Sequence, residues 1–108
     1  MLQHTEVKQR FTRIERDIEE AAKSCSTDAK LPKNFKDCVM EWKQHAVKAK
    51  PIFESHDDNQ MLLCVDDLEK IGERAEAALE HIVDADSKIK NSILRANSEL
   101  IDLMKKMH

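Results

Sequence analysis

The sequence predicts an all-α protein, and three observations carry that prediction. The 108 residues contain one glycine and two prolines, so few positions interrupt regular structure. Alanine, leucine, glutamate and lysine, whose side chains lose little rotamer freedom in a helix, are frequent. Apolar residues recur at alternating steps of three and four along most of the chain, which is the spacing of one helical face. We therefore expect a single helical-bundle domain over residues 1–108.

The first expected helix runs from about Gln3 to Ser24. Charged residues fill the positions between its apolar residues, which follow heptad spacing and comprise Val7, Phe11, Ile14, Ile18, Ala21 and Cys25. Residues 24–34 then break the pattern with small polar side chains, as connections do. A second helix is expected to start there, with Pro32 in its first turn or Asn34 as its N-cap.

The second expected helix continues the apolar spacing towards Pro51. Its stripe consists of Phe35, Cys38, Val39, Trp42, Ala46 and Ala49. Proline has no backbone N–H and clashes with the preceding turn, so we expect the helix to end or kink just before Pro51. Ile52 and Phe53 would then lie in a connection and tuck under the end of the bundle. The candidate caps for the next helix are Ser55, Asp57 and Asp58.

Residues 57–107 allow two architectures, because the apolar spacing continues through the whole segment. This seam comprises Val65, Leu68, Gly72, Ala75, Leu79, Ile82, Asp86, Ile89, Ile93, Ala96, Leu100, Leu103 and Met107. A turn at 83–88, capped by Asp84 or Asp86, would give two helices and complete a four-helix bundle. Without that turn, one helix of about fifty residues, about 75 Å long, would need a second chain to bury it. We expect the antiparallel four-helix bundle, because such long helices are uncommon in small domains and Asp and Ser disfavour helix interiors.

Charge is distributed unevenly along the chain, although the net charge is only −3. Residues 30–50 contain six lysines and two acidic residues, whereas residues 57–86 contain ten acidic and two basic residues. We interpret the two segments as neighbours that complement each other, since charge runs on helices usually mark solvated faces. The alternative is an acidic face that docks a basic partner. The small net charge and the lack of arginine in 30–50 argue against nucleic-acid binding.

Cysteine usage and hydropathy indicate a cytoplasmic protein without a metal centre or cofactor. The cysteines form no C-x-x-C pair and fall near apolar stripes, at Cys25, Cys38 and Cys64. No apolar run approaches the ~20 residues that span a membrane, and no segment combines basic residues with aromatic membrane anchors. Two acid–histidine pairs one helical turn apart could hold an adventitious ion, and we interpret both as surface pairs: Glu41 with His45, and His81 with Asp84.

The sequence offers little for catalysis. It contains no G-x-S-x-G motif and no phosphate-binding glycine loop. Its one glycine, Gly72, falls inside an expected helix, where it indicates close helix packing. A small helical chain with short connections also has few places for a preorganised pocket. We therefore expect no enzymatic activity and no small-molecule substrate.

The stretch His45-Ala46-Val47-Lys48-Ala49 is similar to the phosphoacceptor motif of histidine phosphotransfer domains, commonly His-x-Leu-Lys-Gly. Those domains are four-helix bundles whose second helix displays the histidine. The resemblance implies His45 as the phosphoacceptor, with Lys48 one turn on to stabilise phosphate charge. Ala49 stands at the family's glycine, and the bulky Trp42 lies one turn before the histidine. We keep phosphotransfer as the alternative and interpret His45 as a boundary residue beside the apolar stripe.

The preferred functional hypothesis is protein–protein interaction without catalysis, as in an adaptor, a regulator or a chaperone-like protein. A long apolar seam can bury itself against a protein partner or a second copy, and two-fold homodimers are the commonest assemblies. We expect the contact face in the C-terminal half, where the seam is longest. The expected interaction residues are Ile89, Ile93, Leu100 and Leu103.

Overall fold

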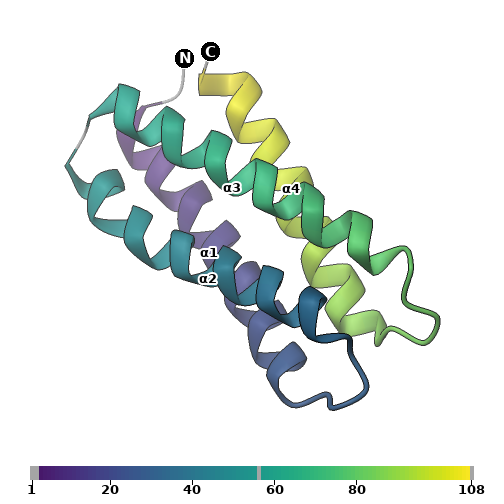
Figure 1. The fold of residues 1–108 in the computed structure, drawn as a ribbon. Helices are drawn as coiled ribbons and strands as arrows, with labels where there is room; N and C mark the ends of the chain where they lie inside the picture. Colours follow the sequence, from purple (N-terminus) through teal and green to yellow (C-terminus); the bar gives the residue numbers. More distant parts are fainter. Residues whose placement is uncertain (1–2, 56, 108) are drawn as a thin grey trace.

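A computed structural model describes residues 3–55 and 57–107 and shows an all-α antiparallel bundle of four helices (Figure 1). The helices are α1 (His4–Ser26), α2 (Lys33–Glu54), α3 (Asp58–Leu79) and α4 (Ser87–Met107). Each helix packs on two neighbours, in the cyclic order α1, α2, α3, α4 and back to α1. The α1–α2 and α3–α4 connections lie at the same end of the bundle (Figure 1). The four-helix prediction is confirmed, and no helix of the described residues is long and apolar enough to cross a bilayer.

Aspartate side chains cap the last two helices. Asp57 precedes α3 and accepts a hydrogen bond from the backbone N–H of Gln60 at 3.1 Å, which satisfies one of the free donors of the first turn. Asp86 precedes α4 and accepts from the backbone N–H of Lys88 at 2.8 Å. The turn predicted at 83–88 is confirmed, although α3 already ends at Leu79.

The structure corrects the end of α2, because the helix continues through Pro51 to Glu54. A proline in a helix interior costs about 3 kcal/mol. Phe53 offsets this cost, since it is buried and stacks on Phe11 of α1 with ring centroids 4.0 Å apart. Burying such a ring contributes about 2–3 kcal/mol, and the stacking about 1 kcal/mol more. Ile52 and Phe53 therefore belong to the helix and not to a connection.

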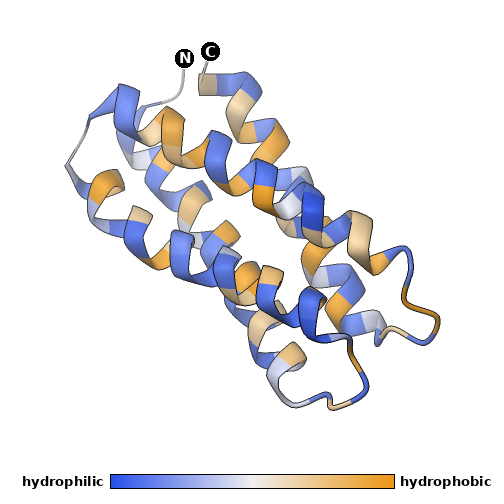
Figure 2. Cartoon of the chain, viewed as in Figure 1, coloured by the Kyte–Doolittle hydropathy of each residue, from blue (hydrophilic) through white to orange (hydrophobic). Residues whose placement is uncertain are grey.

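Apolar side chains from all four helices fill the interior of the bundle. Figure 2 shows hydrophobic residues recurring along each helix with hydrophilic residues between them. The largest fully buried side chains include Trp42, Phe35, Ile14, Ile18, Met61, Leu68, Ile89, Ile93, Leu100 and Leu103. The seam predicted for the C-terminal half is thus covered by the chain's own helices, without a second chain.

Two polar side chains reach across the interior and bind the backbone of α3. The indole N–H of Trp42 donates to the carbonyl of Leu68 at 2.9 Å. The side-chain amide of Asn97 on α4 donates to the carbonyl of Gly72 at 2.9 Å and to Oε1 of Glu76 at 3.0 Å. Buried donors need such acceptors, because an unpaired one loses its hydrogen bonds to water without replacement. We call Trp42, Leu68, Gly72 and Asn97 the α3 node.

Gly72 permits the close approach of both side chains because it has none of its own. A Cβ atom at this position would overlap Oδ1 of Asn97 and lie 2.8 Å from Cζ2 of Trp42. The expectation of close helix packing at Gly72 is therefore confirmed. Its neighbours come from α2 and α4, so one residue of α3 sets the spacing of three helices.

Replacing Gly72 with alanine sets helix propensity against packing. Alanine gains about 1 kcal/mol from propensity. Displacing Asn97 and Trp42 costs about 1–3 kcal/mol and also weakens buried hydrogen bonds worth about 1 kcal/mol each. We expect Gly72→Ala to lower the free energy of unfolding measured in urea. Ala77→Gly, at an exposed position of α3, should lose only about 1 kcal/mol as the propensity control. A stabilised Gly72→Ala would show that the α3 node is not tightly packed.

The adjacent residues Ile93 and Leu94 should respond differently to a charge. Ile93 is fully buried, whereas Leu94 is 39% exposed. Ile93→Asp would place an unpaired carboxylate in the core at a cost of several kcal/mol, comparable to the whole stability of a small domain. We expect Ile93→Asp to lose the helical circular-dichroism signal and Leu94→Asp to keep it. A folded Ile93→Asp would contradict the placement of the core.

Candidate functional site

His45 lies on the side of α2 that faces α3, and its side chain is partly exposed. Its Nδ1 is 2.5 Å from Oδ2 of Asp67 on α3. In the neutral tautomer whose Nδ1–H donates to this carboxylate, Nε2 carries the lone pair. One turn earlier on α2, Glu41 accepts from Arg74 of α3 at 2.8 Å. Both contacts join an acidic side chain to a donor across the α2/α3 side of the bundle.

The residues expected to act with His45 are not gathered around it. Lys48 is exposed and forms no hydrogen bond or ion pair within residues 3–55 and 57–107. Trp42 is fully buried, with its N–H on the carbonyl of Leu68, so it belongs to the interior and not to the surface beside the imidazole. His45 therefore sits at the boundary of the bundle with one acidic partner.

The two candidate ion-binding pairs are not formed. Glu41 is bound by Arg74, so it does not pair with His45. His81 and Asp84 lie in the connection after α3, which ends at Leu79, so they do not share a turn of helix. In the described part of the chain, no three histidine, cysteine or acidic side chains come together in a way that could hold a metal ion.

The four expected interaction residues lie in the core. Ile89 is 1% exposed, and the other three, Ile93, Leu100 and Leu103, are 0% exposed. They hold the four helices together from within, and a second copy cannot reach them while the bundle is intact. A contact surface on the folded chain must therefore be built from other residues.

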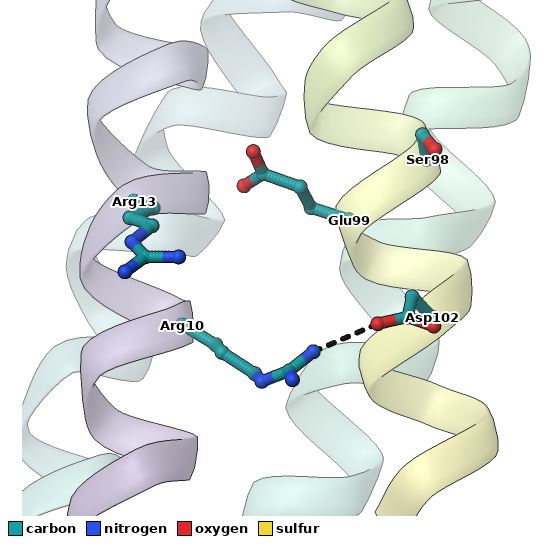
Figure 3. Close-up of a pocket in the computed structure, with 5 residues that line it drawn as sticks. All are labelled: Arg10, Arg13, Ser98, Glu99 and Asp102. Atoms are coloured by element: carbon teal, nitrogen blue, oxygen red, sulfur yellow. Dashed lines mark hydrogen bonds and ion pairs between the residues drawn. The ribbon is translucent and has the colours of Figure 1, made fainter.

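A polar groove of about 280 Å³ lies between α1 and α4 (Figure 3). Arg10 donates to Asp102 across it at 2.7 Å, and this hydrogen bond holds the pKa of Asp102 below its usual range. Figure 3 shows Glu99 reaching from α4 into the space between the helices, beside Arg13 of α1. The basic side chains of this groove come from α1 and its acidic side chains from α4. Their attraction across the groove therefore helps to hold α1 against α4.

Glu99 also interacts with Asp17, a nearly buried aspartate on α1. Burial raises the pKa of both carboxyl groups, and the charge of Asp17 raises that of Glu99 further. Arg95, whose Nε lies 3.7 Å from Oδ1 of Asp17, opposes the shift at Asp17. Oε2 of Glu99 is buried without a hydrogen-bond partner among the described residues, so no donor stabilises its charged form there.

Glu99→Gln should stabilise the protein at neutral pH. Because its pKa is raised in the folded state, Glu99 holds a proton there that the unfolded chain releases, so stability falls as the pH rises above the unfolded-state pKa of about 4.3. Glutamine carries no charge at either pH and so removes this loss. We expect a higher urea midpoint than wild type at pH 7, with the difference shrinking towards pH 4. An equal difference from wild type at both pH values would contradict the raised pKa of Glu99.

Ion pairs join most neighbouring helices, but none among the described residues joins α3 to α4. Those that link α1 to α4 are Arg10–Asp102, Lys88–Glu20 and Arg95–Asp17. Lys8 and Glu54 link α1 to α2. The expected complementarity between residues 30–50 and 57–86 is limited to the His45–Asp67 and Glu41–Arg74 contacts. Neither contact uses a lysine of α2, and among the described residues the carboxylates of Glu69 and Glu73 on α3 have no ion-pair partner.

The side of the bundle between α3 and α4 combines carboxylates with exposed apolar side chains. Oε1 of Glu76 accepts from Asn97, and the side chains of the other three glutamates of its row form no ion pair or hydrogen bond in the described residues. On α4, Leu94 and Ile101 stand one heptad apart and are 39% and 40% exposed. A groove of about 430 Å³ lies at one end of this surface, with Glu76, Glu80 and Leu94 in its lining. The set that we call the α3/α4 face comprises Glu69, Glu73, Glu76, Glu80, Leu94 and Ile101.

Sequence reasoning missed this face, although its signal is present. The four glutamates follow steps of four, three and four, which places them along one line of a helix. Leu94 and Ile101 each follow a core residue directly, so the sequence pattern does not distinguish them from the buried apolar seam. Only the packing of α3 on α4 shows that they border the glutamate row.

No protein-family model, curated protein or solved structure matches this chain.

Proposed function

We propose that this chain is a non-enzymatic interaction module that binds a protein partner through the α3/α4 face. The observation that carries the proposal is the glutamate row without intramolecular ion pairs, set beside Leu94 and Ile101. The α1/α4 and α2/α3 sides pair charges across the helices, whereas the α3/α4 side has no such ion pair in the part of the chain that the structure describes. An apolar centre with a charged rim is the usual anatomy of a protein–protein contact.

The cysteines support a non-catalytic role. Burial raises the pKa of the Cys25 thiol to about 11 and also raises the pKa of the Cys38 and Cys64 thiols. A protonated thiol is a poor nucleophile, so none of the three has the thiolate character of a catalytic cysteine. The proposal includes a cytoplasmic location, because three free cysteines stay reduced in such a compartment.

Phosphotransfer through His45 is the second candidate, and one contact favours it. Nδ1 lies 2.5 Å from Oδ2 of Asp67, and in the tautomer that donates to this carboxylate the partly exposed imidazole can offer the lone pair of Nε2 to a phosphoryl donor. The position on the second helix of a four-helix bundle also fits the resemblance of His45-Ala46-Val47-Lys48-Ala49 to phosphotransfer domains. Against it, the carboxylate of Asp67 would repel a phosphoryl group, and Lys48 makes no contact that would place it at the imidazole.

A crosslinked pull-down from the lysate of the chain's own host separates the two functions. The baits are wild type, Leu94→Asp, Leu63→Asp and His45→Gln, with captured proteins quantified by mass spectrometry. Leu63 is a matched control, because it is also a leucine, is 62% exposed and lies outside the α3/α4 face. We expect the captured partner to persist with Leu63→Asp and His45→Gln and to fall at least tenfold with Leu94→Asp, the cost of placing a charge in an apolar contact.

Two other outcomes would redirect the assignment. Loss of the captured proteins with His45→Gln alone would favour phosphotransfer over the α3/α4 face. Equal capture by all four baits would show that neither Leu94 nor His45 belongs to the binding site. Circular dichroism of each bait confirms that the helical bundle is intact before the comparison is made.

A further inference from the structure

The outer surface of α2 carries a row with the opposite character to the α3/α4 face. Its residues follow steps of four, three, four and three, so they lie along one line of the helix: Lys36, Met40, Lys43, Val47 and Lys50. Met40 is 39% exposed and Val47 is 51% exposed. We call these five residues the α2 row.

The lysines of the α2 row are not neutralised by close contacts. The nearest acidic side chains on α1 include Glu15, which senses the charge of Lys50, and Glu19, which shares a shallow groove with Lys43. Neither glutamate comes within ion-pair distance of a lysine of the row in residues 3–55 and 57–107. The row therefore presents two apolar side chains between three positive charges.

The α2 row and the α3/α4 face lie on opposite sides of the bundle. Met40 and Lys43 border a groove together with Glu19, Ala22 and Lys23 of α1, which places the row on the α1/α2 side. The helices pack in the cyclic order α1, α2, α3, α4, and the diagonal pair α1 and α3 meets only near the start of both helices, where His4 Nε2 lies 3.4 Å from Oδ1 of Asp58. The α1/α2 side is therefore the one opposite the α3/α4 side.

The two surfaces match in spacing as well as in charge. Met40 and Val47 are separated by one heptad, as are Leu94 and Ile101, which is about 10.5 Å along each helix. Lysines flank Met40 and Val47 along α2. The four glutamates of the α3/α4 face lie on α3, and they outnumber Lys90, which lines the groove shared by Glu76, Glu80 and Leu94. Two aligned pairs would exclude water from four half-exposed apolar side chains while oppositely charged rims meet.

We infer that the α3/α4 face binds the α2 row of a second copy of this chain. This inference rests on the proposed function and names the partner for that face. Because each copy carries both surfaces on opposite sides, the contact is heterologous, and every added copy leaves one surface of each kind free. The assembly is then a head-to-tail row of bundles and differs from the two-fold homodimer that the sequence suggested.

Complementary variants give a direct test by sedimentation velocity on the purified full chain. One variant, Lys43→Glu with Val47→Asp, loses the α2 row and keeps the α3/α4 face. The other, Glu73→Lys with Leu94→Asp, loses the α3/α4 face and keeps the α2 row. All four positions lie on the surface, and circular dichroism verifies folding. Lys30→Glu with Leu63→Asp changes a lysine and a leucine outside both surfaces as the control.

We expect wild type and the control to form species larger than a dimer as concentration rises, and each variant alone to stay monomeric. An equimolar mixture of the two variants should give a 1:1 dimer and nothing larger, because each variant keeps one of the two surfaces. Raising the salt from about 0.05 M to about 0.5 M should weaken wild-type assembly about tenfold or more, since surface charges are screened.

Three results would overturn the inference. Wild type that stays monomeric at low salt shows that a second copy is not the partner, and the Leu94-dependent capture from lysate then decides separately whether the proposed function stands. A dimer formed by the α2-row variant alone indicates a two-fold contact through the α3/α4 face. Variants that remain monomeric when mixed show that the two surfaces do not bind each other.

Discussion

The hydrogen bonds of Trp42 and Asn97 to the backbone of α3 are the constraint on which the arrangement of the bundle depends. Apolar contacts alone tolerate sliding and rotation between helices. A buried hydrogen-bond donor, by contrast, must meet its acceptor at one position along the neighbouring helix. Trp42 fixes α2 against the carbonyl of Leu68, and Asn97 fixes α4 against that of Gly72. Gly72 makes both contacts possible by leaving room where any side chain would intrude. Three helices are thereby aligned within one turn of α3.

This alignment also determines which charges meet. With α2 and α4 held at fixed positions along α3, Glu41 reaches Arg74 and His45 reaches Asp67. Within residues 3–55 and 57–107, no basic group of α4 comes within ion-pair distance of the glutamate row. Basic and acidic residues, which lie in separate segments of the sequence, therefore also lie on separate parts of the folded surface. Unpaired surface charge contributes little to stability, so its concentration on one side bears on association more than on the fold.

The sequence was sufficient for the architecture because helical periodicity and capping are local. Heptad spacing predicted the four helices, and Asp57 and Asp86 marked two of their starts. Pro51 misled the prediction because the burial of Phe53 against Phe11 is a contact between distant segments. The interaction residues were placed on the seam for the same reason: periodicity identifies an apolar face but does not say which element covers it. The α3/α4 face needed the packing of two helices, which no single segment encodes.

Trp42 has a consequence for observing the protein in solution. It is the one tryptophan in a chain without tyrosine, and its ring is fully enclosed with the N–H on a backbone carbonyl. The near-ultraviolet fluorescence of the chain therefore originates from a single position at the centre of the bundle. That emission reports on the interior where α2 meets α3, and contacts made by the outer surface leave its surroundings unchanged. The molecule thus contains a native optical probe that separates the loss of its core from its association with other molecules.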